Sequence, residues 1–407
     1  MTGSDEAQTL IALLDTPEGK ADPFPLFRRL REIAPVHRDE QAGLWRLFGW
    51  EDCNRVFRSD RFGQGAPGGR LRADPRFEGS ATLKTMAENI TMLDPPEHTR
   101  LRALVQRAFI LPSVERMRGY VQELTRTLLD ELEGRAQFDV IADYAARIPN
   151  SVICEMLGVP RADHRLFDKW LADQFRLVRP TPAPDELLAD TDNSTRALED
   201  YLSGLIDERR QAPREDLISA LIAAETEGDR MTHREVVVMI GLLLAGGSES
   251  TKTVIALAVR NLLLDPPQLA RLRADPALDR TAVEELIRFD NPIVMANVRL
   301  SFDDAELSGV RIAAGEAVVP MVAAANRDPA KFEGAEQLDL GRTPNPHLAF
   351  AAGVHQCLGV ALARLEAGQA IGALVRRFPN LQLVDEAPDV NLNLASLRGL
   401  NNLRVAA

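Results

Sequence analysis

A cysteine near the C-terminus has neighbours typical of a metal-ligating thiolate. Cys357 follows Phe350-Ala351-Ala352-Gly353-Val354-His355-Gln356 and precedes Leu358-Gly359. Gly353 and Gly359 leave backbone room for a flat, bulky group, and the apolar run that follows predicts a helix whose N-terminal end stabilises a thiolate. A lone cysteine is more often a small buried hydrophobic residue. The glycines and the helix start favour a thiolate that could hold a heme iron.

A second group of chemically capable residues lies where a helix is expected to begin. Asp94 is placed to cap this helix, Pro95 suits its first position, and Glu97 completes the spacing of a capping box. His98 and Arg102 are four residues apart and therefore share one face. This face is either a solvated basic surface or a partner for the carboxylates of a partly buried cofactor.

The longest predicted helix carries an unusual pair of glycines. It begins at a capping box formed by Thr232 and Glu235 and ends before Asp265-Pro266-Pro267, which makes it roughly 45 Å long. Its first half is apolar on every side, which predicts burial. Gly246 and Gly247 then cost roughly 1 kcal/mol each relative to alanine. They favour the close approach of a flat ligand or a local opening of the helix, and helix–helix packing is the alternative.

Two further pairs of polar residues have spacings that matter. Glu249 and Ser250 place a carboxyl group and a hydroxyl group directly after the glycine pair. Glu285 and Arg288 are three residues apart on another predicted helix. Taken alone, such a pair is usually a surface ion pair worth roughly 0.2–0.5 kcal/mol.

The elements that must position these residues are mostly helices. Helical spacing of apolar residues recurs from Pro95 to the region near Phe378, whereas strand-like stretches are short and lie near the two ends. One predicted hairpin pairs Val36-His37-Arg38 with Leu44 to Phe48, and further strands are expected within Leu307 to Val319 and Leu381 to Val384. The pattern predicts a mainly α fold with a minor β part.

Composition excludes several classes of function. The formal net charge of −12 disfavours nucleic acid and anionic membrane surfaces as partners. The three cysteines, Cys53, Cys154 and Cys357, are too far apart for a disulfide framework or a structural zinc site. The acidic N-terminus does not resemble a signal peptide, and the most apolar run, Val236 to Ala245, is shorter than the roughly 18 residues of a membrane span. We therefore expect a soluble, cytoplasmic protein.

Together, these segments resemble the cytochrome P450 family. The cysteine loop is similar to the family's heme-binding pattern Phe-Gly-x-Gly-x-His-x-Cys-x-Gly, except that Ala351 stands where the family usually has glycine. The stretch from Gly246 is similar to the oxygen-activation motif Gly-x-Asp/Glu-Thr, with Ser250 at the threonine position. Glu285 and Arg288 match the family's Glu-x-x-Arg element. The resemblance covers nearly the whole chain, with the motifs in the right order and spacing.

The resemblance implies a role for each candidate residue. The cofactor is heme b, and Cys357 is the ligand of its iron. Among the catalytic residues Glu249, Ser250 and Thr251, we rank Ser250 above Thr251 because a shift of one residue rotates a helical side chain by about 100°. The residues implied to bind the cofactor are His98, Arg102, Arg299, His355, Cys357, Phe350 and Gly246, the first four of them through the propionates. The residues implied to support the cysteine loop are Glu285, Arg288 and Arg342.

The substrate site is implied only in outline. The resemblance places Met92, Leu243, Leu244, Ala245, Val294, Met295, Ala296 and Asn297 around it. These residues are mainly apolar, so we expect a lipophilic small molecule, with Asn297 as a possible anchor for a polar group. Pro180 to Pro184 interrupts two helical patterns and is either a lid over the substrate entry or a plain connection between helices.

The resemblance also implies the fold, the reaction and the partners. We expect a single large domain over residues 1–407, mainly α with small β sheets, of the triangular-prism-like cytochrome P450 type. The implied function is a heme-thiolate monooxygenase that activates O2 and hydroxylates or otherwise oxidises its substrate. Electrons come from a ferredoxin and its NAD(P)H-dependent reductase. The five arginines Arg100, Arg107, Arg116, Arg118 and Arg364 either form a basic face where the electron donor docks or are ordinary solvated arginines, which are as frequent.

Two other classes of function stay open at this point. A heme-binding sensor of gas or redox state would use the same cysteine without turnover. A hydrolase would use Cys357 as a nucleophile, with His355 or His98 as its base, but it needs neither the glycine pair nor the arginines. Glu249 and Ser250 beside the glycines favour oxygen chemistry over both alternatives.

Overall fold

The chain divides into two compact units. The computed structural model describes residues 3–65, 69–108, 111–164, 166–167, 170, 183–226, 228–385, 387, 389–392 and 396–407. The first unit comprises Met1–Gly63, Leu124–Ala145 and Ser250–Ala407, and the second comprises Gln64–Glu123 and Ala146–Glu249. Two of the boundaries fall within helices, α8 (Leu111–Leu132) and α13 (His233–Leu264), which therefore contribute to both units. The expectation of a single domain over residues 1–407 stays a prediction.

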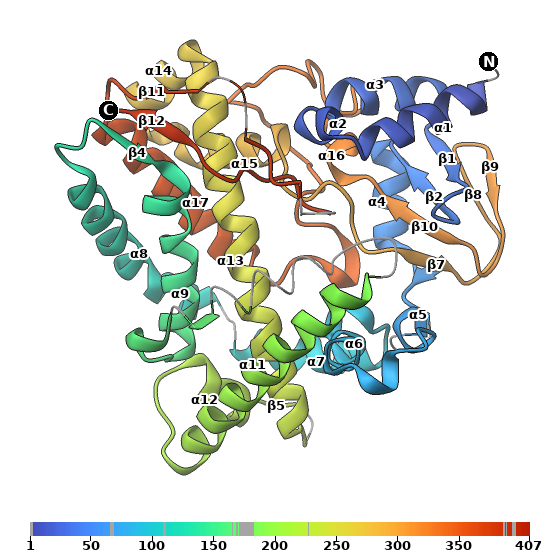
Figure 1. The fold of residues 1–407 in the computed structure, drawn as a ribbon, viewed down its shortest axis with the longest axis horizontal. Helices are drawn as coiled ribbons and strands as arrows, with labels where there is room; N and C mark the ends of the chain where they lie inside the picture. The colour runs from blue at the N-terminus through green and yellow to red at the C-terminus, as the bar shows by residue number, and fades with distance from the viewer. Residues whose placement is uncertain are drawn as a thin grey trace. The chain divides into compact units, whose positions relative to one another are not determined.

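The first unit combines helices with small sheets (Figure 1). Its helices outside α8 and α13 are α1 (Gly3–Leu14), α2 (Pro17–Ala21), α3 (Phe24–Ile33), α4 (Trp50–Arg58), η3 (Val140–Ala145), α14 (Pro266–Ala274), η5 (Pro276–Leu278), α15 (Asp279–Phe289), α16 (Val322–Ala325), η6 (Gly353–His355) and α17 (Val360–Arg377). Its strands are β1 (Val36–Asp39), β2 (Leu44–Leu47), β3 (Phe62–Gly63), β4 (Gln137–Asp139), β7 (Arg299–Ser301), β8 (Ala305–Leu307), β9 (Val310–Ile312), β10 (Ala317–Pro320), β11 (Gln382–Leu383) and β12 (Arg404–Ala406).

The largest sheet contains the hairpin that the sequence predicts. Its strand order is β1-β2-β10-β7-β3. β1 and β2 are antiparallel, with Val36 opposite Leu47 and Asp39 opposite Leu44, so the predicted hairpin is confirmed. β10 runs parallel to β2 and antiparallel to β7. The chain thus returns, more than 230 residues after β3, to add β7 and β10 to a sheet that its N-terminal part began.

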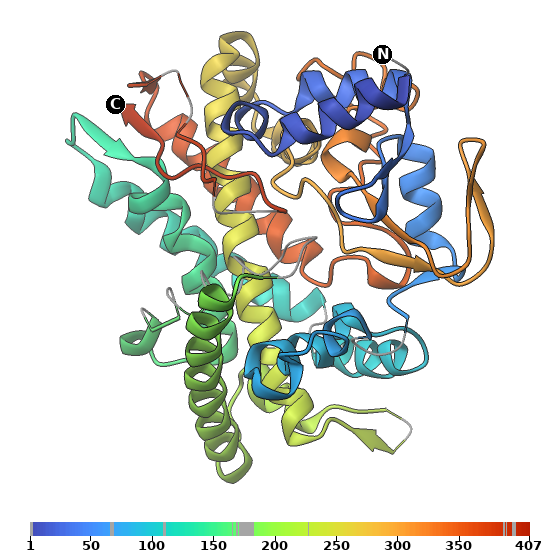
Figure 2. The same ribbon diagram turned by 45° about the vertical axis from the view of Figure 1, so that its right-hand side comes forward.

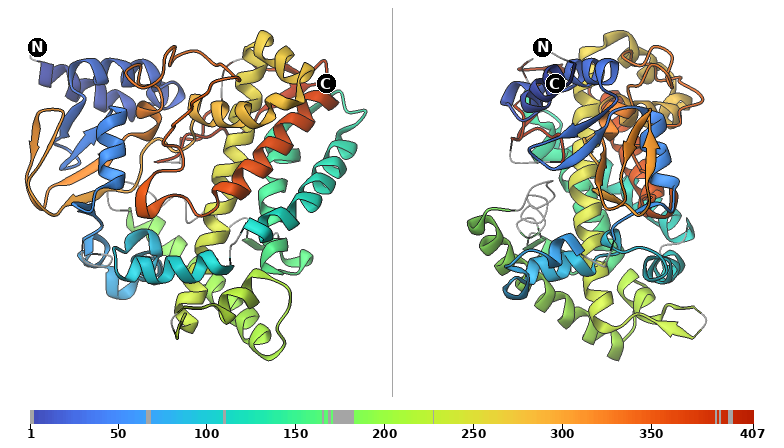
Figure 3. Two further views of the ribbon diagram at one scale, coloured as in Figure 1. Left: turned by 180° about the vertical axis from the view of Figure 1, so that it is seen from behind. Right: turned by 90° about the vertical axis from the view of Figure 1, so that its right-hand side faces the viewer.

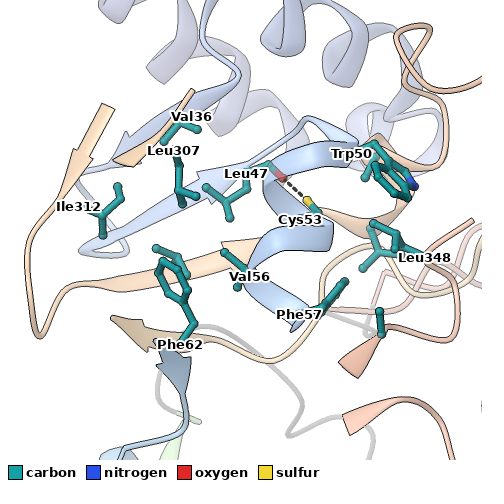
Figure 4. Close-up of a cluster of buried hydrophobic side chains, with 14 of the residues drawn as sticks. Val36, Leu47, Trp50, Cys53, Val56, Phe57, Phe62, Leu307, Ile312 and Leu348 are labelled. Atoms are coloured by element: carbon teal, nitrogen blue, oxygen red, sulfur yellow. Dashed lines mark hydrogen bonds between the residues drawn. The ribbon is translucent and has the colours of Figure 1, made fainter. Parts of the chain in front are cut away.

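Both faces of this sheet are covered by apolar side chains. Successive residues of a strand point to opposite faces, and accordingly Val318 belongs to one buried cluster and Val319 to the other. The cluster of Val318 includes side chains of α4 (Figure 4), and that of Val319 includes side chains of α1 and α3. Cys53 is fully buried in the α4 cluster, where its thiol donates to the carbonyl oxygen of Leu47 at 3.2 Å. Burial raises the pKa of Cys53, which marks it as a structural thiol.

The second unit is almost entirely helical. Its remaining elements are α5 (Gly69–Arg72), η1 (Phe77–Gly79), α6 (Ala81–Glu88), η2 (Ile90–Met92), α7 (Glu97–Ala108), α9 (Arg147–Leu157), η4 (Arg161–Asp163), α11 (Asp185–Gln211), α12 (Leu217–Ala223), β5 (Glu225–Thr226) and β6 (Asp229–Arg230). The short β5–β6 hairpin leads directly into α13 (Figure 2). The structure therefore matches the predicted mainly α composition with a minor β part.

Helix α13 begins as the sequence predicts. The amide of Glu235 donates to the hydroxyl of Thr232 at 3.2 Å, and the amide of Thr232 donates to the carboxylate of Glu235 at 2.8 Å, which confirms the capping box. From Val236 to Ala245 nearly every side chain is buried, also as predicted. By length and composition alone the whole helix could cross a membrane, but 56% of its most apolar stretch is buried within the protein. Core helices share this property, so the evidence for a membrane span is weak.

Candidate functional site

The cysteine loop lies against the C-terminal end of α4, in the first unit. Gly353 has a φ of +69°, and a Cβ atom there would meet the carbonyl oxygen of Phe57 at 2.1 Å, so this position requires glycine. The amide of Cys357 donates to the carbonyl oxygen of Phe350 at 2.9 Å and closes the loop. α17 begins three residues after the cysteine. The backbone thus holds Cys357 just before the N-terminal end of a helix, as the sequence predicts.

Cys357 differs from the other two cysteines in its surroundings. Cys53 and Cys154 are buried, whereas Cys357 is exposed. Within the residues that the structure describes, no group of three or more His, Cys, Asp or Glu side chains could hold a metal ion. The exposed thiol of Cys357 can reach a bound group that the two buried thiols cannot reach.

The departure at Ala351 is visible in the backbone. Ala351 has a φ of +53°, in the left-handed region where glycine is usual and a Cβ atom costs about 1–2 kcal/mol. Its side chain is half-buried against the α4 cluster. The loop therefore keeps the conformation that a glycine would adopt, at some conformational cost.

A charged network that the sequence analysis missed lies beside this loop. Glu284 accepts from Nε2 of His347 at 3.1 Å and from both Nε and Nη2 of Arg364, at 2.6 and 2.7 Å. The ring of Phe350 lies 5.8 Å from the His347 ring and 5.2 Å from the Arg364 guanidinium. The network joins α15, α17 and the segment before the loop. Of these, α15 and α17 lie side by side (Figure 3). His347 and Arg364 are 63 and 80 residues from Glu284, so no local pattern indicated it.

The hydrogen bonds of this network set the ionisation of Glu284. Burial by itself raises the pKa of the Glu284 carboxyl. The hydrogen bonds and positive charges of His347 and Arg364 outweigh burial, and they lower the pKa from 4.5 to about 2. Glu284 is therefore a carboxylate at any ordinary pH.

The structure brings together the three residues predicted to support the loop. Glu285 and Arg288 are completely buried, and the Nε of Arg288 lies 2.8 Å from a Glu285 oxygen. Nε of Arg342 donates to the same oxygen at 3.0 Å. Arg288 also donates to the carbonyl oxygens of Asn326 and Ala335. Taken alone, the sequence pair reads as a surface ion pair, and this reading is wrong because tertiary packing covers both side chains.

The two predicted propionate partners of the first unit lie in different elements. Arg299 begins β7 and is 6% exposed. His355 ends η6 and is half-buried, two residues before Cys357. An arginine is always cationic and an imidazole carries an N–H donor, so both side chains can bind a carboxylate.

The two propionate partners predicted in the second unit share α7. His98 is 2% exposed and Arg102 is half-buried, one turn further along the helix. The predicted cap is wrong. The carboxylate of Asp94 accepts from the amides of Gln64 and Gly65 at 2.8–2.9 Å, and the helix begins only at Glu97. A contact about 30 residues away in the chain has replaced the local one.

The double glycine does not interrupt α13. The helix is continuous through both residues, so the structure shows no break of the helix there. A Cβ atom on Gly247 would make only ordinary contact with Ile153 at 3.6 Å, so packing does not require glycine at this position. Gly246 is exposed, and a Cβ atom there would have no protein atom within 4 Å. Open space beside Gly246 is what the approach of a flat ligand requires.

The predicted catalytic residues follow Gly246 on the same helix. Glu249 and Ser250 are half-buried, and Thr251 is 5% exposed. The structure adds Ser248, whose hydroxyl donates to the carbonyl oxygen of Leu244 at 3.0 Å. Ser248 thereby uses its hydroxyl within the helix, as serine commonly does.

The predicted substrate residues form two sets, one in each unit. Met92 ends η2, and Leu243 to Ala245 are buried residues of α13 in the second unit. Val294 to Asn297 form a half-buried segment of the first unit outside helices and strands, where the amide of Ala296 donates to the carbonyl oxygen of Pro320 at 2.9 Å. Of the predicted lid, Pro180 to Pro182 lie outside the described residues, and Ala183 and Pro184 precede α11.

Arg100, Arg118 and Arg364 of the predicted docking face form ion pairs within the protein. Arg100 pairs with Asp229 and Glu235, Arg118 pairs with Glu115, and Arg364 pairs with Glu284. Their charges are largely compensated by these carboxylates. The docking face stays a prediction.

Comparisons with known proteins agree with these features. A family model described as "Cytochrome P450" matches residues 70–396. The chain is 33% identical over 405 residues to "Polyketide biosynthesis cytochrome P450 PksS" of Bacillus subtilis, covering 97% of this chain and 98% of the relative. It is 38% identical over 371 residues to "Cytochrome P450 monooxygenase PikC" of Streptomyces venezuelae, covering 89% and 85%.

The fold is also similar to a solved structure. The crystal structure of P450BioI in complex with an acyl carrier protein ligated to hexadec-9Z-enoic acid superposes with a TM-score of 0.89 at 31% identity, over 96% of this chain and 100% of that chain. The predicted fold class is thereby confirmed.

Proposed function

Because the chain belongs to the cytochrome P450 family and is therefore a heme-thiolate monooxygenase with heme b as its cofactor, we propose that Cys357 supplies the thiolate to the heme iron. The observation that carries this proposal is the exposure of Cys357 before the start of α17, in contrast to the buried Cys53 and Cys154. When bound, the heme activates O2 and transfers one oxygen atom to a small-molecule substrate.

The residues available for the rest of the heme fit its chemistry. Its two propionates need charged or N–H partners, which we assign to His98, Arg102, Arg299 and His355. Its flat ring needs a surface without protruding side chains. Gly246 offers such a surface because a Cβ atom at that position would stand in open space, and Phe350 is assigned to the cysteine side.

The proton transfers of the reaction fall to the residues after Gly246. We assign to the Glu249 carboxylate the uptake of a proton from water and to the Ser250 hydroxyl its delivery into the site, because a hydroxyl both accepts and donates. Serine lacks the β-branch of the usual threonine, so its Oγ atom turns more freely. Thr251 is the alternative relay, and its deeper burial and different direction on the helix rank it second.

The substrate proposed for this enzyme is lipophilic. Leu243 to Ala245, Met92 and the segment Val294 to Asn297 are mainly apolar, and Asn297 is the one polar anchor among them. The named relatives act in polyketide biosynthesis or bind a fatty acid attached to a carrier protein, which supports a lipophilic substrate without identifying it.

The proposed electron donor is a ferredoxin with its NAD(P)H-dependent reductase. Cytochromes P450 take electrons from redox partners, and the three widely spaced cysteines of this chain provide no iron–sulfur motif of its own. We further propose that residues 1–407 act together as one catalytic domain and that the enzyme works in the cytoplasm.

Carbon monoxide binding tests the assignment of Cys357. The dithionite-reduced protein should give the strongly red-shifted carbon monoxide band of thiolate ligation, and Cys357→Ser should lose this band. Cys53→Ala is the matched control and should keep it. If Cys357→Ser retained the band, another residue would be the ligand. With ferredoxin, reductase and NAD(P)H, substrate-dependent consumption and an oxygenated product separate a monooxygenase from a sensor.

A further inference from the structure

The first unit contains a cavity that the proposed catalytic roles do not explain. It has an empty volume of about 520 Å3, which includes space open to solvent. Residues from α1, α2, α3, β2 and the C-terminal segment surround it. Its lining consists of Leu14, Asp15, Gly19, Lys20, Pro23, Phe27, Arg46, Val294, Met295, Met321, Val390, Asn391, Leu397 and Arg398.

The walls of this cavity are tied together by hydrogen bonds between distant parts of the chain. Nζ of Lys20 donates to the carbonyl oxygen of Leu392 at 3.2 Å, and Nη2 of Arg398 donates to that of Ala21 at 2.9 Å. The amide of Val294 donates to the carbonyl oxygen of Ser396 at 2.9 Å. The C-terminal segment thus lies beside α2 (Figure 1). The cavity is a built feature of the unit, closed by its first and last segments.

Most of the lining is apolar, but three cations stand among the apolar residues. Arg46 is 6% exposed, pairs with Asp39 through Nε and Nη2, and directs Nη1 to the weak acceptor sulfur of Met321. Arg398 is 7% exposed and pairs with Asp290 through Nη1.

Donor capacity remains on two of these cations. The buried Nε–H of Arg398 has no hydrogen-bond acceptor among the residues that the structure describes. Lys20 is half-buried, and among the described residues no carboxylate forms an ion pair with it. Asp15 is the one acidic residue of the lining, and it is exposed to solvent.

From this arrangement we propose that the cavity is a second small-molecule site, which binds a carboxylate attached to an apolar chain. A carboxylate only accepts hydrogen bonds, so it matches the remaining donors of Lys20 and Arg398. The chain of the ligand would lie against Leu14, Phe27 and Met321. An amine of the same length could not accept from these donors and would meet the charge of Lys20, so its binding is disfavoured.

This site is separate from the catalytic assignments, although it shares two residues with the proposed substrate segment. Val294 and Met295 line the cavity, and they begin the stretch that continues to Asn297. The inference does not require that this stretch contacts the substrate of the monooxygenase. It requires only the cavity and its donors.

Isothermal titration of octanoate into the heme-loaded protein tests this proposal. The heme site is first saturated with 4-phenylimidazole, which binds the iron and blocks the distal pocket. We expect one equivalent of octanoate to bind under these conditions. Lys20→Met should weaken octanoate binding roughly five- to tenfold and should leave the weaker binding of 1-octanol unchanged, because only octanoate carries the charge.

Lys84→Met is the matched control, since it removes the same charge from a lysine that does not line the cavity. It should bind octanoate as the unchanged protein does. Octylammonium, which needs no variant, should not bind. The proposal is overturned if octanoate does not bind beside 4-phenylimidazole, if octylammonium binds equally well, or if Lys20→Met and Lys84→Met have the same affinity for octanoate.

Discussion

Glu284 and Glu285 are neighbours on α15, and each is the centre of a charged cluster, yet the two clusters differ in depth. Glu285 is completely buried and accepts from Arg288, Arg342, Asn345 and the amide of Asp339. The Glu284 side chain is 21% exposed and accepts from His347 and Arg364. One step along a helix turns a side chain by about 100°, which is enough to separate the interior from the surface.

The difference teaches what each cluster can do. A buried ion pair is costly to form, and breaking it is costlier, because an uncompensated charge then remains in the interior. The cluster of Glu285 therefore fixes the backbone at Asn326, Ala335 and Asp339. The cluster of Glu284 is partly screened by water. It links α15 to α17 and to His347 before the cysteine loop, and breaking it should cost less free energy.

The largest effect is expected for Glu285→Ala. This substitution leaves Arg288 as a buried cation without its carboxylate and removes the acceptor of Arg342, so it should lower the free energy of unfolding by about 3–5 kcal/mol. Urea denaturation followed by circular dichroism measures this change. Glu284→Ala, one residue away, is the control and should lose clearly less. Equal losses in the two variants would show that burial does not distinguish the clusters.

The sequence predicted those parts of the molecule whose contacts are local. The β1–β2 hairpin and the capping box of Thr232 and Glu235 depend on residues within about a dozen positions, and both are confirmed. The cap expected from Asp94 failed because the amides of Gln64 and Gly65 compete for its carboxylate from about 30 residues away. Local propensity gives way to tertiary contacts of this kind.

The candidate site divides in the same way. Cys357 and its loop glycines were readable because a short motif carries them. The network of Glu284, His347 and Arg364 was missed because only the packing of α15 and α17 brings these side chains together. The burial of Glu285 and Arg288 was likewise invisible, since the same i to i+3 spacing occurs on exposed helices.

Acid should weaken the cluster of Glu284. The folded pKa of Glu284, about 2, lies below its ordinary value of 4.5, so the network stabilises the fold fully above pH 4.5. This contribution, up to about 3 kcal/mol, should be lost as the pH falls from 4.5 towards 2. Urea denaturation of the unchanged protein and of Glu284→Gln across this range measures it. The difference in unfolding free energy between the two should shrink as the pH falls, and a constant difference would contradict the assignment.

The smallest effect is expected for Arg364→Gln, which tests how much the exposed end of the Glu284 cluster contributes. The Arg364 side chain is 45% exposed, so water and salt screen its bidentate pair with Glu284, and His347 continues to donate to the same carboxylate. We expect a loss of less than about 1 kcal/mol in the free energy of unfolding, part of it from the contact of the guanidinium with the Phe350 ring. Arg364→Lys keeps the charge but not the two-pronged guanidinium. Its free energy of unfolding should lie between those of the unchanged protein and Arg364→Gln. The loss should also diminish in high salt, because an exposed pair is screened and a buried one is not. A loss as large as that of Glu285→Ala, unaffected by salt, would mean that the two clusters act as one buried network and that the boundary drawn between Glu284 and Glu285 is wrong.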